Sequence, residues 1–252
     1  MLVLALAVVT PGHLALFSPH LGEGAFYTVI SYLLMVLPVS VLAIFMLAAF
    51  LKGIGNFWRA TGGRPGERVN WRANRQAIWD VLRLRYLDGG GYGCNYPDDR
   101  FSMVRRWFHH LTFYGFMACI AATTVAAGYD HFLHWQAPYP FRSWPVMLGT
   151  GGGLSMLAGT GGLLYLKFRM DRAPAAPRVF GMDRGFLLLL FFINLTGLLL
   201  LFFRETPAMG TLLVVHLGVV VSLFITMPYG KFLHAVYRYT ALVRNALEQS
   251  QN

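Results

Sequence analysis

Two histidines near the end of the chain, His216 and His234, have the most informative type and spacing. They stand eighteen positions apart, which is five turns of an α-helix at about 3.6 residues per turn, so on one continuous helix they share a face. At a rise of about 1.5 Å per residue they lie roughly 27 Å apart, close to the thickness of the hydrocarbon core of a bilayer. The spacing therefore predicts one imidazole near each membrane surface.

Four more histidines flank a second apolar stretch, at residues 107–128: His109, His110, His131 and His134. If this stretch forms a helix antiparallel to the last one, the first two come level with His234 and the last two with His216. A neutral imidazole from each of two facing helices is what a six-coordinate b-type haem requires. The pattern predicts that one histidine of each level set ligates haem iron, in one or two haems.

Three basic residues close to these histidines are candidates for binding the haem propionates: Arg105, Arg106 and Lys231. Lys231 lies three positions before His234, about one helical turn away. Cationic side chains pair well with carboxylates, but they also mark the ends of membrane spans, so both interpretations stay open. Pro228 is expected to kink the helix that carries the two histidines.

The composition indicates an all-α integral membrane protein. The chain has 252 residues, of which 56% are hydrophobic and 13% charged, about half the charged share of soluble domains. Five apolar runs are long enough to span a bilayer: Tyr27 to Leu51, Trp107 to Gly128, Trp144 to Leu166, Gly185 to Phe203 and Thr211 to Gly230. We expect residues 1–26 to form a partial or interfacial segment, and residues 27–252 to form the haem-binding helix bundle.

The basic residues predict the orientation of the bundle. Of 21 Lys and Arg residues, eleven fall in 52–106, five in 167–184 and three from Lys231 onward, leaving Arg142 and Arg204 on the opposite side. The positive-inside rule then makes the connector 52–106 and the C-terminus cytoplasmic, in a bacterial-type inner membrane. Anionic lipid is the expected partner of these charges. Nucleic acid is not, because the basic residues border spans and form no separate domain.

Three other features bear on partners and packing. The two cysteines, Cys94 and Cys119, are too few to hold an iron–sulfur cluster, so any cluster must belong to a missing or separate module. Trp71 to Leu87 has the pattern of a basic amphipathic helix on the inner membrane surface. The glycine-rich run that follows is a tight connector, a haem cap or a docking surface. Small residues at four-residue spacing in the third span predict close helix packing.

The last span, with its two histidines and a Pro-x-x-Lys-x-x-His ending, resembles the membrane cytochrome b family typified by the gamma subunit of respiratory nitrate reductase. That resemblance implies two stacked b haems ligated by helix-borne histidines. In the partner helix this family has a second histidine about three turns beyond the first, where this chain has Ile120. The outer haem therefore depends on His131 or His134.

A closer resemblance covers most of the chain. The strings Gly-Gly-Gly-Tyr-Gly-Cys-Asn-Tyr-Pro at 89–97, Arg-Arg-Trp-Phe-His-His-Leu-Thr-Phe-Tyr-Gly-Phe at 105–116, Gly-Met-Asp at 181–183 and Thr-Met-Pro-Tyr-Gly-Lys-Phe at 226–232 resemble the membrane portion of the tricarballylate utilisation protein B family, also called the citrate utilisation CitB family. The resemblance implies electron transfer from a flavoprotein dehydrogenase through 4Fe-4S clusters and haem b to quinone. This chain matches the membrane module alone.

Two other functions compete with this one: a carrier for tricarboxylates or other organic anions, and a haem-free membrane anchor. A carrier for trianions is expected to place basic side chains near the bilayer midplane. None of the five predicted spans has an interior Lys, Arg, Asp or Glu. The sequence therefore favours a redox subunit that relays electrons to the quinone pool over either alternative.

Overall fold

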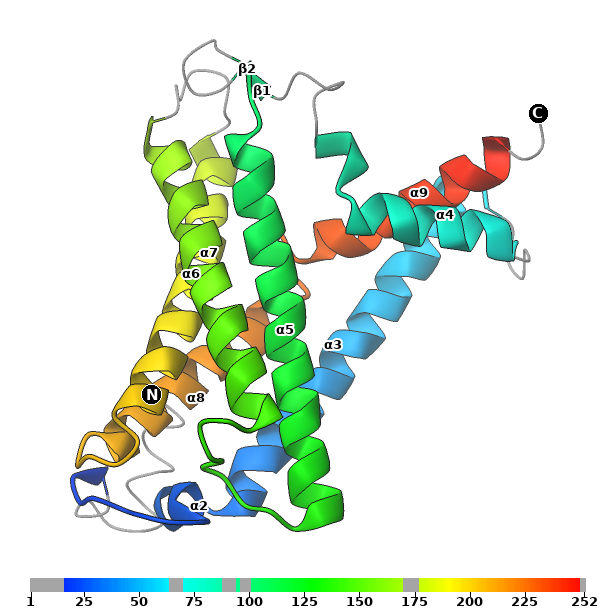
Figure 1. Ribbon diagram of the computed structural model, residues 1–252. Coiled ribbons are helices and arrows are strands. Elements are labelled where there is room, and N and C mark those ends of the chain that lie inside the picture. Colours follow the sequence, from blue (N-terminus) through cyan, green and yellow to red (C-terminus); the bar gives the residue numbers. More distant parts are fainter. Residues whose placement is uncertain (1–15, 64–69, 88–93, 96–100, 170–176, 250–252) are drawn as a thin grey trace.

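The computed structural model describes residues 16–63, 70–87, 94–95, 101–169 and 177–249 (Figure 1). Helices dominate this part of the chain, which confirms the all-α prediction. Its only strands are the two-residue β1 (Cys94–Asn95) and β2 (Phe101–Ser102), which pair antiparallel where the chain returns toward the bundle.

Three long helices stand side by side: α5 (Val104–Leu133), α6 (Trp144–Arg169) and α7 (Pro177–Phe202) (Figure 1). We call the end at which α5 and α7 begin the basic end, and the end at which they finish the distal end. Helix α8 (Met209–Thr226) packs against α7, and α3 (Tyr32–Ala60) packs against α8. The bundle therefore has a layer of three helices, α5, α6 and α7, with α8 and α3 packed beyond α7.

Among the described residues, four helices are long and apolar enough to cross a membrane: α3, α5, α8 and the Gly181–Phe202 part of α7. Five such spans were predicted, and α6 is the difference. It forms a helix of 26 residues beside α5 and α7, but its many glycines make it less apolar than the other four. The first predicted span also begins later than expected, because Tyr27 lies in a separate short helix, α2 (Ala25–Val29).

Helices α5 and α6 approach so closely that no side chain fits at their contact points. A Cβ atom on Gly115 would lie 2.8 Å from the Gly152 carbonyl oxygen, and one on Gly159 would lie 2.6 Å from the Thr112 amide nitrogen. Backbone atoms cannot move aside as the end of a side chain can. The prediction that small residues in the third span permit close packing is confirmed.

The chain breaks where one continuous helix was expected. Helix α8 ends at Thr226, residues 227–232 form successive turns, and α9 (Leu233–Gln249) begins there. The predicted five-turn alignment of His216 and His234 on one helix is therefore wrong. Pro228 lacks an amide donor and is followed two positions later by Gly230, so the two residues end the helix instead of kinking it.

Helix α9 turns away from the bundle and packs along α4 (Trp71–Leu82) (Figure 1). Ala73 and Ala77 of α4 meet Val243 and Leu247 of α9 in a small apolar cluster. The predicted amphipathic helix from Trp71 is confirmed as far as residue 82, after which a short 3₁₀ turn, η2 (Arg85–Leu87), follows. We call α4 and α9 together the α4–α9 arm.

Two predicted segments lie largely outside the described residues. The N-terminal apolar segment is described only from residue 16, and the glycine-rich run after residue 87 only at Cys94 and Asn95. Their predicted roles stay predictions.

Candidate haem site

A cavity of about 610 Å³ lies between the helices of the bundle. Its walls are formed by α5 from Phe116 to Ala126, by α6 from Pro145 to Met156, by α7 from Ile193 to Leu201 and by α8 from His216 to Phe224, with Arg204 and Met227 just beyond the ends of α7 and α8. The volume falls in the range of about 300–1,000 Å³ that is typical of small-molecule and cofactor sites. Most of the lining is apolar, so a bound molecule must itself be largely apolar.

His216 is the only histidine among the described residues that line this cavity. Its Nδ1 lies 3.0 Å from the Thr196 hydroxyl, which also lies 2.8 Å from the Phe192 carbonyl oxygen. The hydroxyl has one hydrogen, which it donates to that carbonyl, so it accepts from the Nδ1–H of His216. The lone pair then lies on Nε2, which is the arrangement of a metal-ligating histidine held by a neighbour.

A glycine allows the His216 ring to lie flat against α7. A Cβ atom on Gly197 would lie 3.0 Å from Cε1 of His216, closer than ordinary van der Waals contact. Together, Gly197 and Thr196 fix the position of the imidazole at the cavity wall. His216 thus lies at the cavity wall with apolar space beside it.

A second group of histidines lies at the basic end. His109 on α5 and His234 on α9 are close enough to interact electrostatically, and Arg238, one turn beyond His234, also acts on His109. The Nδ1–H of His234 donates to the Lys231 carbonyl oxygen, which leaves its Nε2 free. Nδ1 of His109 is buried without a hydrogen-bond partner. His109 and His234 are thus near enough at the basic end for their charges to influence each other.

Aromatic residues hold the two helices together just below this pair. The ring centroids of Phe116, two turns beyond His109, and Phe232, two residues before His234, are 5.1 Å apart. Phe232 also stacks on Phe50 of α3 at 6.1 Å. The break between α8 and α9 therefore still brings His234 back to α5, although the expected single helix is absent.

His110 points elsewhere. Its ring stacks on Tyr114 at 5.8 Å with planes 5° apart, and it lies 6.0 Å from Trp107. Successive helical residues are about 100° apart around the axis, so His109 and His110 cannot both face α9. Of the two predicted partners of His234, His109 is the one on which the charge of His234 acts, whereas His110 packs against Trp107 and Tyr114.

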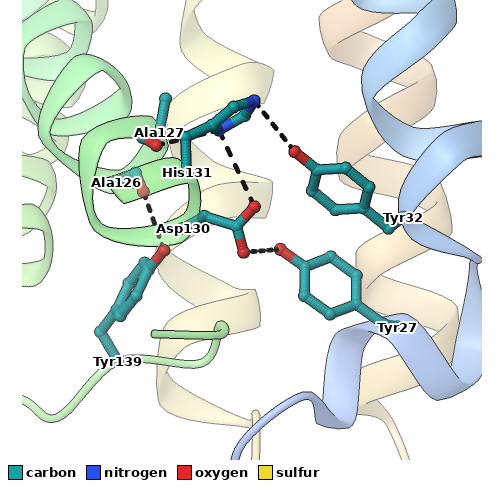
Figure 2. A network of polar contacts seen from close by, with 7 residues as sticks. All are labelled: Tyr27, Tyr32, Ala126, Ala127, Asp130, His131 and Tyr139. Carbon is teal, nitrogen blue, oxygen red and sulfur yellow. Dashed lines mark hydrogen bonds and ion pairs between the residues drawn. The ribbon is translucent and has the colours of Figure 1, made fainter. Parts of the chain in front are cut away.

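His131, a predicted partner of His216, belongs to a separate polar network at the distal end (Figure 2). Its Nδ1 lies 3.0 Å from the Ala127 carbonyl oxygen, and its Nε2 lies 3.1 Å from the Tyr32 hydroxyl. Both ring nitrogens are thus engaged, and His131 does not line the cavity. His134 is exposed at the C-terminal end of α5, with a left-handed backbone. The structure does not bring either residue to His216.

The same network contains a carboxylate that the sequence analysis did not single out. Asp130 is 14% exposed and accepts a hydrogen bond from the Tyr27 hydroxyl at 3.0 Å (Figure 2). Burial and this hydrogen bond raise the pKa of Tyr27, and burial together with the charge of Asp130 raises the pKa of Tyr139 to about 12. Both tyrosines therefore stay protonated at neutral pH. Each donates its one hydroxyl hydrogen within the protein, Tyr27 to Asp130 and Tyr139 to the Ala126 carbonyl oxygen.

The predicted propionate-binding residues have protein partners. Lys231 forms an ion pair with Asp183, whose other oxygen lies 2.5 Å from Nζ of Lys167. Arg106 donates to the Arg83 carbonyl oxygen at 3.0 Å. Arg105 is exposed on the first turn of α5. The Lys167–Asp183–Lys231 cluster ties the ends of α6 and α7 to the turn before α9, so it fixes the position of His234.

The donor set suits a porphyrin better than a bare ion. No group of three or more His, Cys, Asp or Glu residues is arranged to hold a metal ion in the part of the chain that the structure describes. A porphyrin supplies four equatorial nitrogens itself and needs only axial ligands from the protein. A single imidazole at the wall of an apolar cavity, as His216 is, therefore fits a porphyrin.

Comparisons with known proteins agree with the strings found in the sequence. The family model described as citrate utilization protein B matches residues 1–252. A relative from Escherichia coli named citrate utilization protein B is 50% identical over 213 residues, which cover 82% of this chain and 55% of the relative. The chain thus spans about half the length of this curated relative. No solved structure matches. The chain belongs to the citrate utilization protein B family.

Proposed function

We propose that this chain is a membrane electron-transfer module that binds b-type haem and relays electrons to quinone during citrate or tricarballylate utilisation. The family and the name of the relative support a role in citrate utilisation. The apolar spans and the oriented histidines support haem in the membrane. Reduction of a tricarboxylate or its oxidation would belong to a partner protein, while this chain provides the haem sites.

The geometry of His216 carries the proposal. An ionisable side chain within an apolar span is costly, and here it is oriented by Thr196 toward a cavity of cofactor size. A histidine that serves only packing has no need of a fixed tautomer beside such a space. The pairing of His109 with His234 supports a second haem at the basic end.

Bound haem would supply one-electron oxidation and reduction at its iron. The chain's own residues have simpler tasks. Thr196 holds the tautomer of His216, and Gly197 leaves room for its ring. The apolar walls of the cavity would keep the local dielectric low, which influences the potential of any bound redox centre.

The partners are proposed from the family resemblance, which implies a flavoprotein and 4Fe-4S clusters. With Cys94 and Cys119 as its only cysteines, it cannot hold an iron–sulfur cluster alone, so a 4Fe-4S module is expected on another polypeptide segment. A flavoprotein dehydrogenase would deliver electrons to that module. We further propose that the basic end faces the cytoplasm, in contact with anionic lipid, and that quinone receives the electrons within the membrane.

Reduced-minus-oxidised spectra and a pyridine haemochrome assay of the purified chain test the proposal. We expect a b-type signal that falls by about half, or disappears, in His216→Ala and in His234→Ala. His109→Ala is expected to act like His234→Ala. His134→Ala is the matched control, because this imidazole is exposed and does not line the cavity, and it should retain the full signal. Wild-type protein without haem, or full occupancy in both His216→Ala and His234→Ala, would refute the proposal.

A further inference from the structure

Arg204 is a buried cation at the distal end of the cavity. It lies in the turn between α7 and α8, and its side chain is only 9% exposed. It is also the only Lys or Arg among the described residues that line the cavity. Arg142, the other basic residue at the distal end, is exposed. A charged group at the end of an otherwise apolar space requires an explanation.

The protein satisfies this guanidinium only in part. Nη1 donates to the Tyr139 carbonyl oxygen at 2.5 Å, and the group lies over the Phe141 ring at 3.8 Å. Nε is buried without a hydrogen-bond partner. The nearest carboxylate oxygen, on Glu205, is 3.8 Å from Nε and belongs to a side chain that is 70% exposed. A buried guanidinium is stabilised by an anion that accepts from its N–H donors, and no buried carboxylate among the residues that the structure describes does so.

We propose that Arg204 binds a carboxylate of the molecule that occupies the cavity, namely a propionate of the haem whose iron His216 ligates. This inference rests on the function proposed above. It adds a propionate-binding residue on the distal side, whereas Arg105, Arg106 and Lys231 all lie at the basic end.

The distances along the helices agree with such a ligand. Thr196, which holds His216, precedes Arg204 by eight residues, about 12 Å at the helical rise. A porphyrin that stands along α7 has its iron at the centre and both carboxylates at one edge. The imidazole on the cavity wall and the cation at the distal end therefore correspond to the two polar parts of one planar, otherwise apolar molecule.

A free tricarboxylate shares the carboxylate chemistry but suits the cavity less well. Citrate carries up to three negative charges, and the described lining offers one cation for them. The rest of the wall would leave two carboxylates without partners, at a high desolvation cost. The apolar lining suits a porphyrin face instead.

Haem dimethyl ester tests the role of the carboxylates, because its propionates are esterified and carry no charge. Protein made in haem-deficient cells is titrated in detergent with haem, with the ester and with citrate. Wild-type protein is expected to prefer haem to the ester by about 10- to 100-fold, the range of a charge-assisted hydrogen bond. In Arg204→Gln the two ligands should bind within about 3-fold of each other. Arg204→Lys should retain part of the preference, and Arg142→Gln all of it.

The ratio of the affinities for haem and for its dimethyl ester distinguishes a failure of this inference from a failure of the proposed haem function. If Arg204→Gln does not fold, it binds neither haem nor the ester. The affinity ratio of Arg204→Lys is then compared with that of wild-type protein. Equal binding of haem and ester by wild-type protein would overturn the inference while the proposed haem function stands. Wild-type protein that binds neither porphyrin would overturn both. Citrate binding that depends on Arg204, without haem binding, would assign the site to a free tricarboxylate and would also overturn the inference.

Discussion

Replacing Asp183 by asparagine is expected to lower the free energy of unfolding by about 2–4 kcal/mol. The substitution keeps the shape of the side chain and removes its charge. It leaves the ammonium groups of Lys167 and Lys231 next to a neutral amide and close to each other. The three side chains join the ends of α6 and α7 to the turn that precedes His234. The loss should therefore affect both stability and haem binding at the basic end.

The size of the expected loss in unfolding free energy follows from the solvent exposure of the three side chains. Asp183 is 14% and Lys167 18% exposed, so the interaction between them is partly buried and contributes about 1.5–3 kcal/mol. Lys231 is 41% exposed, and solvent screening limits its ion pair to about 1 kcal/mol or less. The double variant with Lys231→Met should lose less stability than the sum of the two single variants, because they remove the same ion pair.

Reversible unfolding in mixed micelles, followed by circular dichroism, measures these differences, and a haemochrome assay reports occupancy. Glu248→Gln is the matched control: it breaks the exposed ion pair with Arg244 on α9 and should cost about 0.3–0.5 kcal/mol. If Asp183→Asn stays within about 0.5 kcal/mol of wild-type protein, the ion cluster does not hold these helices together and the reasoning is refuted.

Two further predictions test the helix contacts and the orientation of His216. Gly159→Ala should destabilise the protein by about 1–3 kcal/mol, because its Cβ would lie 2.6 Å from the Thr112 amide nitrogen. Gly151→Ala on the same helix meets nothing within 4 Å and should be neutral or stabilising by up to about 1 kcal/mol; equal losses in both variants would contradict the close contact. Thr196→Val should weaken haem binding about 10- to 100-fold and raise its midpoint potential, since His216 becomes a poorer donor to ferric iron. Thr196→Ser should restore both values in a redox titration; an unchanged potential in Thr196→Val would show that the hydroxyl does not position the ligand.

The helices were predictable because long apolar runs leave few alternatives to a helix in a membrane. The third span shows where this reasoning is weaker. Its glycines reduce its hydropathy below that of the other spans, yet the same glycines allow α6 to pack closely on α5. The amphipathic pattern from Trp71 also predicted α4, although its partner, α9, was expected to continue the last span.

The arrangement of the site was harder to predict. A prediction from the spacing of His216 and His234 assumes that one helix continues between them. Two helix-breaking residues, Pro228 and Gly230, invalidate the five-turn alignment. His109 and His110 are neighbours in the sequence, so they differ only in the side of α5 from which they project. Their distance along the chain from His234 is nearly the same and does not show which of them faces it. In the sequence, Arg204 directly follows an apolar span, which is typical of an exposed loop residue at a membrane surface. Only the packing of α7 and α8 around a cavity reveals that it is buried.

The turn at residues 227–232 has a mechanical consequence. Two imidazoles on one rigid rod would shift together, but here His216 is anchored to α7 through Thr196, whereas His234 begins the α4–α9 arm. His234 is held instead by the ion cluster of Lys167, Asp183 and Lys231, so its depth is set separately from that of His216. Breaking this cluster should shift α9 relative to α8; spin labels on the two helices would measure the shift, and an unchanged separation would show that the turn is stiff by itself. The break thus gives the two histidines separate anchors.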